Sequence, residues 1–304
     1  MEDHLLIALK KKVPALADAT NISILKGGLT NVNYRLDTPS DKYVIRISDK
    51  KTSLLGIERE NERINAQRAY LAGVGAEIID FLSEEDILVI KWIDAKTLHK
   101  DDIQSQPELL ERIARAVRAL HKGPKFQQDF YFPSVRKKYL EIVQENNFFI
   151  PDDYLRLDSL VVELESLLKV HPEPLVPCNN DLLAENFLDD GTKIWIIDYE
   201  YSGQNEPSFE IGNMASELAL NRAQLVRLCN VYWEQNLDHK VWRALAWSVI
   251  ARFGWVMWAS IQEKVSKISF DFRGWGLRKW NSVLPELEGD QYQEIFKNLI
   301  DFNQ

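Results

Sequence analysis

The chain contains little cysteine and little histidine, which narrows the kinds of site it can hold. Of its 304 residues, two are cysteine and five are histidine. Two cysteines do not make the disulfide framework of a small secreted domain, and neither they nor the histidines have the spacing of metal ligands. The composition therefore favours a reducing compartment. Cys178 has no histidine close to it in the sequence, so we expect a small buried apolar residue and not a nucleophile.

The chain also lacks an excess of positive charge. It has 37 Lys and Arg against 46 Asp and Glu, which gives a net charge of −9. Nucleic acids bind basic surfaces through their phosphates, so an acidic chain argues against nucleic acid as the main partner. The same acidic surface would favour the approach of a cationic small molecule.

No apolar run suggests a membrane span. The most apolar stretch, residues 249–261, is interrupted by Arg252 and is shorter than the roughly 20 residues that cross a bilayer. The N-terminal sequence MEDHLLIALKKK begins acidic and has no long apolar run, so neither a secretory signal nor a transit peptide is expected. The sequence therefore predicts a cytoplasmic protein.

The patterns that are present predict an α+β protein of two lobes. With 45% apolar residues, a chain of this length can bury a sizeable core. Helical spacing and runs of β-branched residues place the expected elements. We expect helices at 1–20, 57–71, 104–121 and 154–170, strands at 22–26, 33–37, 43–48, 78–81, 87–90 and 194–197, and mostly helix from residue 210 onward. The expected division is a β-rich lobe at 1–91, a hinge at about 92–98, and a mostly helical lobe at 92–304.

Three polar residues between Cys178 and Asn213 carry the clearest chemical signal. Asp181 precedes Asn186 by five residues, and Asp198 follows the apolar strand Ile194–Ile197. This order is typical of phosphotransferases, in which one carboxylate faces the acceptor hydroxyl as a base while an amide and a second carboxylate hold magnesium. A capped turn followed by a hairpin, with Asp190 and Gly191 in the turn, is the purely structural alternative.

The motifs around these residues resemble the choline and ethanolamine kinases, within the aminoglycoside-phosphotransferase-like branch of the protein-kinase-like fold. The resemblance rests on NNDLLAENFL, IDYEYSGQNEPSFEIGN and WVMWASIQEKVSKISFDF, with weaker matches in the N-terminal third. Two positions depart from the family: Asn179 stands where histidine is usual, and Glu210 where aspartate is usual. The resemblance implies that Asp181 is the catalytic base and that Asn186 and Asp198 bind magnesium. His121 also lies in a family-like segment, and we expect it to be structural, near a helix C-terminus.

The N-terminal lobe is expected to bind the nucleotide, ATP. Gly28, Thr30 and Asn31 lie in a turn between two expected strands, where backbone N–H groups could approach phosphates, although a double glycine is also an ordinary hairpin. Arg46 lies on the third strand and could contact phosphate while Glu62 holds it by an ion pair. The alternative is an exposed strand arginine and a solvated helix glutamate. We expect Arg59, together with Glu58 and Glu60, to lie on a solvated helix face.

Aromatic residues in the C-terminal part suggest the acceptor. Trp255 and Trp258 share one face of an expected helix, and Phe270 and Trp275 follow. Such a cluster can surround a quaternary ammonium through cation–π attraction, although an aromatic stripe of this kind can equally be core. By the family resemblance, a six-residue pocket is expected. Its members are Tyr201, Glu217, Trp255, Trp258, Phe270 and Trp275.

The sequence thus predicts an ATP- and Mg²⁺-dependent kinase that phosphorylates the hydroxyl of a cationic amino alcohol, with choline the first choice. Ethanolamine, with three N–H donors, would need more oxygen acceptors. A related phosphotransferase for thiamine or an aminoglycoside is an alternative. A pseudokinase that binds ligand without turnover is another, because Asn179 replaces the usual histidine.

Overall fold

The chain begins with an antiparallel sheet of five strands in the order β1-β2-β3-β5-β4. The structure is a computed structural model, and it describes residues 2–25, 28, 31–48 and 56–304. The strands are β1 (Asn21–Leu25), β2 (Asn31–Asp37), β3 (Lys42–Ser48), β4 (Ile78–Leu82) and β5 (Ile87–Lys91). They agree with the expected strands to within two residues at each end.

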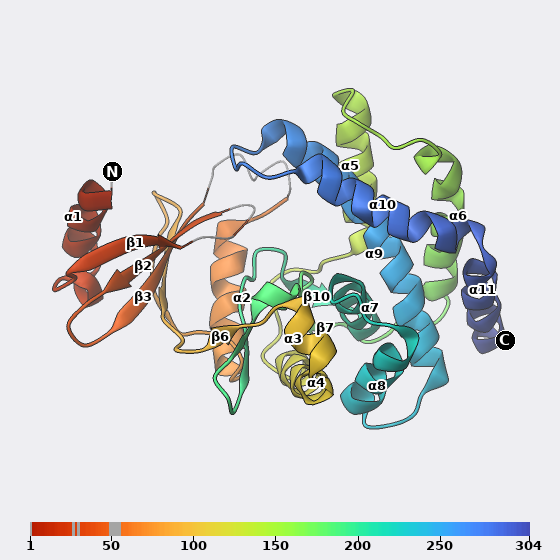
Figure 1. Cartoon of the computed structure of the whole chain (residues 1–304), viewed down its shortest axis with the longest axis horizontal. Coiled ribbons are helices and arrows are strands. Elements are labelled where there is room, and N and C mark those ends of the chain that lie inside the picture. Colours follow the sequence, from red (N-terminus) through yellow and green to blue (C-terminus); the bar gives the residue numbers. More distant parts are fainter. Residues whose placement is uncertain (1, 26–27, 29–30, 49–55) are drawn as a thin grey trace.

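One face of this sheet is closed by the N-terminal helix α1 (Glu2–Lys12). Leu9 of α1 is buried, as are Leu36 of β2 and Ile45 of β3, and the three belong to one apolar cluster. Figure 1 shows α1 at the outer end of the molecule, beyond the strands. The helix is shorter than the expected 1–20 because Pro14 opens a separate short 3₁₀ turn, Pro14–Leu16.

Helix α2 (Arg59–Leu71) lies between the sheet and the helical part of the chain (Figure 1). Its buried residues are small or polar, since Asn61, Glu62 and Asn65 are buried beside Ala66 and Ala69. The amides of Asn61 and Asn65 donate to the carbonyl oxygen of Ser202 at 3.1 and 3.2 Å. The helix is therefore attached to the second part of the chain by hydrogen bonds and also by an apolar cluster that includes Ala66 and Ala69.

Helices form most of the remaining chain, and most of them pack on the long helix α9. They are α3 (Lys100–Ser105), α4 (Pro107–His121), α5 (Phe132–Glu145), α6 (Tyr154–Leu168), α7 (Pro207–Glu217), α8 (Arg222–Trp233), α9 (Asp238–Val265), α10 (Phe272–Glu288) and α11 (Asp290–Asn303). An antiparallel sheet followed by a mostly helical region confirms the predicted α+β class. The division at residues 92–98 stays a prediction.

Helix α9 is longer than the apolar stretch 249–261, which was expected to be too short to cross a bilayer. It has 28 residues, so it is long and apolar enough to cross a bilayer by those measures alone. However, 89% of the most apolar 18-residue stretch of this helix is buried inside the protein. A helix that is apolar on all sides and surrounded by other helices is a core helix. We therefore treat α9 as the centre of the helical core.

Close packing of α7 on α9 depends on Gly212. A Cβ atom at this position would lie 2.1 Å from the carbonyl oxygen of Ala244, which no side chain tolerates. Glycine thus lets the two backbones approach closely. This contact fixes α7, which carries Glu210, Asn213 and Glu217 toward the residues of the candidate site.

Two helix predictions were incomplete. The expected helix at 104–121 is two helices, α3 and α4, because Pro107 cannot continue the first and instead begins the second. Helix α5 was not predicted, although Phe132, Tyr139 and Val143 are buried on it.

Short strands frame the loop that carries the site. They are β6 (Lys96–Thr97), β7 (Val176–Cys178), β8 (Phe187–Asp189), β9 (Ile194–Ile196) and β10 (Gly203–Asn205), which form the sheets β6-β8-β9 and β10-β7. The hairpin between β8 and β9 turns at Gly191, whose φ is +90°. The Asp190 side chain accepts the backbone N–H of Thr192 and Lys193 within the turn. The predicted turn is therefore present, and it returns the chain to Asp198.

Candidate active site

Asp181 and Asn186 lie on one short loop between β7 and β8. Asn186 closes a 3₁₀ turn, Ala184–Asn186, and its Nδ2 donates to the Asp181 carbonyl oxygen at 2.7 Å. The donor end of the amide is thereby engaged, so Oδ1 is the end that could ligate a cation. Asp198 follows β9, and the backbone N–H of Ile197 donates to the Asn186 carbonyl oxygen at 3.0 Å. The hairpin thus brings the three predicted residues into one region.

Asn179 connects the two halves of this region. Its Nδ2 donates to the carbonyl oxygens of Asp198 at 2.7 Å and Ile197 at 3.3 Å, while its Oδ1 accepts the backbone N–H of Asp181 at 3.1 Å. An amide has both donors and acceptors, so it can make these contacts at once. The residue that departs from the family pattern therefore supports the loop by hydrogen bonds.

Asn180 anchors the loop through hydrogen bonds of both its backbone and its side chain. Its φ is +67°, a left-handed conformation that asparagine tolerates better than most residues. The backbone N–H donates to Glu210 Oε1 at 2.6 Å, and the carbonyl oxygen accepts Asn213 Nδ2 at 3.0 Å. Its side chain bonds Asn205 and the Tyr201 carbonyl oxygen at 3.0 and 2.9 Å. The residue before Asp181 is thus fixed on all sides, a role that no sequence pattern predicted.

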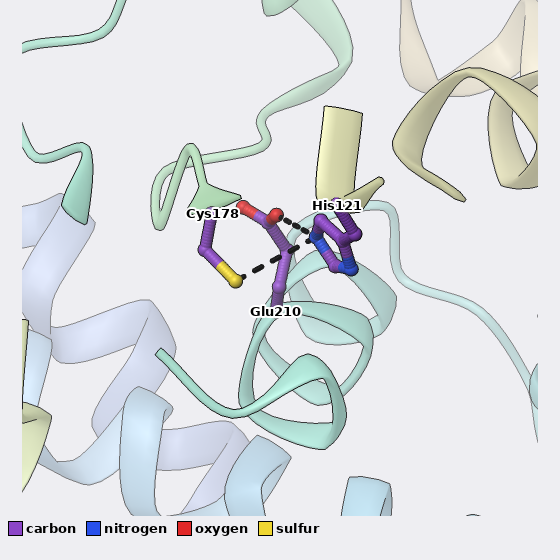
Figure 2. Close-up of side chains that lie close together, drawn as sticks. All are labelled: His121, Cys178 and Glu210. Carbon is purple, nitrogen blue, oxygen red and sulfur yellow. Dashed lines mark hydrogen bonds and ion pairs between the residues drawn. The ribbon is translucent and has the colours of Figure 1, made fainter. Parts of the chain in front are cut away.

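Glu210 and His121 form a buried support behind the loop, as Figure 2 shows. His121 Nε2 lies 2.5 Å from Glu210 Oε2, and its Nδ1 lies 2.6 Å from the Tyr232 hydroxyl. Cys178 Sγ lies 3.6 Å from the same Nε2, although the two residues are 57 positions apart. Burial raises the pKa of the Cys178 thiol well above its ordinary value, so it stays protonated. The structure therefore supports the structural interpretation of both residues.

His121, Cys178 and Glu210 are also residue types that bind metal ions, and their potential ligand atoms lie within 4.8 Å of one another. Both oxygens of Glu210 already accept hydrogen bonds, one from Asn180 and one shared with His121. Both imidazole nitrogens are likewise engaged. We therefore assign the cluster to anchoring the loop that carries Asp181.

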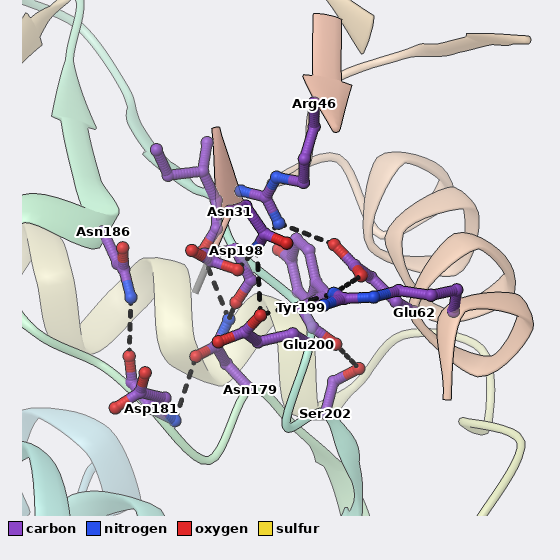
Figure 3. Close-up of polar contacts among 12 residues, drawn as sticks. Asn31, Arg46, Glu62, Asn179, Asp181, Asn186, Asp198, Tyr199, Glu200 and Ser202 are labelled. Atoms are coloured by element: carbon purple, nitrogen blue, oxygen red, sulfur yellow. Dashed lines mark hydrogen bonds and ion pairs between the residues drawn. The ribbon is translucent and has the colours of Figure 1, made fainter. Parts of the chain in front are cut away.

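Asp198 lies between the sheet and the catalytic loop, as Figure 3 shows. Its φ is +64°, so it too adopts the left-handed conformation, which often marks functional positions. Arg46 Nη1 lies 2.8 Å from Asp198 Oδ1 and 2.6 Å from Glu62 Oε1. The predicted ion pair of Arg46 with Glu62 is thus present, and Arg46 has a second partner that was not predicted.

Buried Arg46, Glu62 and Glu200 form a network here with Arg59, which is partly buried. Arg59 Nη1 lies 2.7 Å from Glu62 Oε2 and 3.4 Å from Glu200 Oε2, and only 11% of its side chain is exposed. The prediction that Arg59 lies on a solvated face was therefore wrong, because Glu200 reaches it from 141 residues away. Burial alone would lower the pKa of Arg46, but the charges of Asp198, Glu62 and Glu200 raise it above its ordinary value.

The expected phosphate-binding turn is described only in part. Thr30 lies outside the described residues. Gly28 has a φ of +88°, which glycine adopts readily, and it is exposed. Asn31 is buried, and its Nδ2 donates to Glu200 Oε2 at 3.0 Å. Contact of Gly28 and Asn31 with nucleotide stays a prediction.

The electrostatic setting of Asp181 suits a base. Burial, followed by the charges of Glu217, Asp198 and Glu200, raises the pKa of Asp181 well above its ordinary value, and Lys279 opposes the rise. A carboxylate that holds its proton more tightly is a stronger base once it is ionised. The oxygen donors of Asn186 and Asp198 suit Mg²⁺, which prefers carboxylate and carbonyl ligands.

Four of the six expected pocket residues are connected through direct contacts: Tyr201, Trp255, Trp258 and Trp275. The Trp258 indole N–H donates to the Tyr201 hydroxyl at 2.8 Å, and the rings of Trp258 and Trp275 are 5.3 Å apart. The rings of Trp255 and Trp258 are 6.4 Å apart. Phe270 is 39% exposed and contacts Phe272, so it lies at the outer edge of the group. These side chains are also part of the core, since Trp255 packs on Phe132 at 4.9 Å.

Glu217, the sixth expected residue, already has a cation as its partner. Lys279 Nζ forms an ion pair with Glu217 Oε1 and lies 4.3 Å from the centre of the Trp275 ring. Lys279 was not predicted as part of the site. The signal was available, because Lys279 follows Trp275 by four residues and so shares its face of α10.

Comparison with known proteins identifies the family. A family model described as choline/ethanolamine kinase matches residues 22–283. The chain belongs to the choline/ethanolamine kinase family. Members of this family are phosphotransferases that use an alcohol group as acceptor.

Individual relatives of this family member lie at low identity. It is similar to the protein LicA of Haemophilus influenzae, with 26% identity over 86% of this chain and 99% of the relative. It is similar to a probable ethanolamine kinase of Arabidopsis thaliana, with 24% identity over 86% and 78% of the two chains. The crystal structure of a choline/ethanolamine kinase family protein from Mesorhizobium loti matches 98% of this chain and 99% of its own, with 27% identity and a TM-score of 0.86. The predicted kinase-like fold is thus confirmed.

Proposed function

We propose that this family member is an ATP-dependent kinase that phosphorylates the hydroxyl of a small cationic amino alcohol, with choline as the preferred acceptor. A continuous chain of interactions around Asp181 carries the proposal. Tyr201 bonds Trp258, Trp258 packs on Trp275, and Lys279 joins Trp275 to Glu217. The charge of Asp181 in turn acts on Tyr201, and that of Glu217 acts on Asp181. Tyr201 and Glu217 therefore lie within electrostatic range of the predicted base.

Each polar residue of the site has a role in this reaction. Asp181 would orient the acceptor hydroxyl and take its proton. Asn186 and Asp198 would hold Mg²⁺, which neutralises charge on the transferring phosphoryl group. Arg46, held by Glu62, would contact the phosphates of ATP.

Choline is preferred because the group is rich in aromatic rings. A quaternary ammonium donates no hydrogen bond and gains from contact with the faces of tryptophan and tyrosine. Ethanolamine is the second candidate, and one observation favours it. The ammonium that Glu217 already holds, on Lys279, is a primary one that donates to a carboxylate.

The pseudokinase alternative loses part of its motivation. It rested on Asn179 in place of histidine, yet Asn179 holds the backbone of both Asp181 and Asp198. Such support favours the active enzyme, since catalytic groups must be held by neighbours that are themselves fixed.

The test is ADP release from ATP and Mg²⁺ with choline, ethanolamine, thiamine and an aminoglycoside in parallel. We expect turnover on choline, and we expect Asp181→Asn to lower kcat about 10²- to 10⁴-fold, the usual contribution of a general base. ATP binding by the variant should persist, because Asp181 is not assigned to the nucleotide. Turnover on thiamine or the aminoglycoside alone would point to a related phosphotransferase. Silence on all four acceptors with intact ATP binding would contradict the proposal.

A further inference from the structure

We propose that Lys279 is an internal competitor for the acceptor's cation, an inference that rests on the proposed function. Its ammonium occupies the position between Glu217 and Trp275 that an amino alcohol would use. The acceptor must therefore expel Lys279 before it can bind, and Lys279 sets both the affinity and the selectivity of the site.

The contacts of Lys279 are those expected of a bound ammonium. Nζ donates to Glu217 Oε1 and faces the Trp275 ring at 4.3 Å. The side chain of Lys279 is 11% exposed and that of Glu217 is 6% exposed, so both charges are largely removed from water. A carboxylate and one aromatic face form the two elements of an ammonium site.

The ammonium of Lys279 lies close enough to the predicted base, Asp181, to affect it electrostatically. The charge of Lys279 acts on Asp181, as does that of Glu217. Little of the surrounding surface is open, because Tyr201, Trp255 and Trp258 are only 4–6% exposed. An acceptor ammonium placed among these side chains would thus meet Lys279 directly.

Lysine is suited to leave such a position. Its ammonium sits on a flexible four-carbon stem, and part of the rotamer entropy lost in the ion pair is regained when the side chain moves into water. Glu217 lies on α7 and Lys279 on α10, so the ion pair also joins two helices. A purely structural ion pair between helices is the interpretation that a test must exclude.

The size of the effect follows from occupancy. When only a fraction of molecules has an open site, the apparent dissociation constant is the intrinsic one divided by that fraction. If Lys279 leaves Glu217 in about one molecule in ten, removing its charge should tighten acceptor binding about tenfold.

The experiment compares wild type with Lys279→Met, which keeps the apolar stem and removes the ammonium. We expect KM for choline to fall about tenfold with KM for ATP unchanged, whereas Lys279→Arg should keep the high KM. Lys279→Gln serves as the second uncharged variant if the methionine protein does not fold. The matched control is Arg252→Met, which removes an ion pair between α9 and α10, to Glu286 at 2.5 Å, outside the site. It should leave KM for choline unchanged.

A structural role would give a different pattern. Both Lys279→Met and Arg252→Met would then lower Tm, and KM for choline would rise or stay constant in the former. In the competitor interpretation, the Tm lost in Lys279→Met is regained on adding choline, because the acceptor supplies Glu217 with a cation. If KM for choline falls in neither uncharged variant, the inference is overturned.

Binding of tetramethylammonium, measured by calorimetry, separates this inference from the proposed function. This probe carries the cation without a hydroxyl, so its binding does not depend on turnover. If no acceptor is phosphorylated, the proposed function fails, yet tighter tetramethylammonium binding by Lys279→Met would still support the competitor. Equal binding by wild type and variant would overturn it.

Discussion

Replacing Asn179 with alanine tests how this family member supports its catalytic loop. Asn179 is fully buried, and its side chain satisfies the backbone N–H of Asp181 and the carbonyl oxygen of Asp198. Alanine would leave both groups buried without a partner. At about 1–3 kcal/mol for each unsatisfied group, the free energy of unfolding should fall by about 2–6 kcal/mol.

This loss should be visible as a lower melting temperature and a slower reaction. For a chain of this size, about 2 °C is lost per kcal/mol, so Tm should fall by roughly 4–12 °C. Catalysis should suffer more than folding, since a displacement of about 1 Å at a reacting group can cost about 10²-fold in rate. The KM for ATP should change less than kcat, because Asn179 contacts Asp181 and Asp198 only through their backbones.

The assay is differential scanning calorimetry together with steady-state kinetics of the purified variants. Asn146→Ala is the matched control, because that asparagine is exposed and its side chain donates locally to the Ile142 carbonyl oxygen. Asn179→His should retain activity, since an imidazole offers one donor and one acceptor. A large gain of activity in Asn179→His would instead support the pseudokinase. Wild-type Tm and kcat in Asn179→Ala would refute the reasoning.

Two further predictions concern the charged network beside Asp198. Arg46→Met should raise KM for ATP and lower the free energy of unfolding by about 3 kcal/mol. This is the low end for a broken buried ion pair, because Glu62 keeps a second partner in Arg59. An unchanged KM for ATP would show that Arg46 is not part of the nucleotide site. Burial, with the charges of Asp198 and Glu62, raises the pKa of Glu200 to about 7, so the folded state holds a proton that the unfolded state releases near 4.5. The stabilisation from this proton is therefore present below pH 4.5 and is lost as pH rises to 7, a loss of about 3 kcal/mol. Glu200→Gln should flatten this part of the stability curve in urea titrations at a series of pH values, and an identical slope in wild type and variant would contradict it.

The sequence predicted the residues of the site better than it predicted their partners. Asp181, Asn186 and Asp198 stand in a fixed order along one hairpin, so local spacing was sufficient to bring them together. Arg59 was misjudged because its second partner, Glu200, is distant in the chain and no local pattern reports such a pairing. The chemical roles of all these residues stay predictions, which the variants above test.

The helices and strands show the same contrast: those set by local patterns were predicted, and those that depend on long-range packing were missed. Strands β1 to β5 follow from runs of β-branched residues and turn signals, which act locally. Helix α5 was missed because its buried face depends on packing against α9, and periodicity alone did not reveal it. Aromatic spacing correctly placed Trp255 and Trp258 on one helix. It could not show that they share their space with the core, because burial depends on the whole fold.

The way α2 meets the second part of the chain has a mechanical consequence. An apolar contact is non-directional and tolerates small sliding, whereas a hydrogen bond weakens steeply when its angle changes. The amides of Asn61 and Asn65 both hold the Ser202 carbonyl oxygen, and Arg59 reaches Glu200 two residues earlier. Ala66 and Ala69 add an apolar contact at the same place, so these directional bonds act as a latch on a contact that alone would tolerate small sliding. We therefore expect the sheet and α2 to stay registered on residues 200–202 through small motions, with larger opening requiring these bonds to break together.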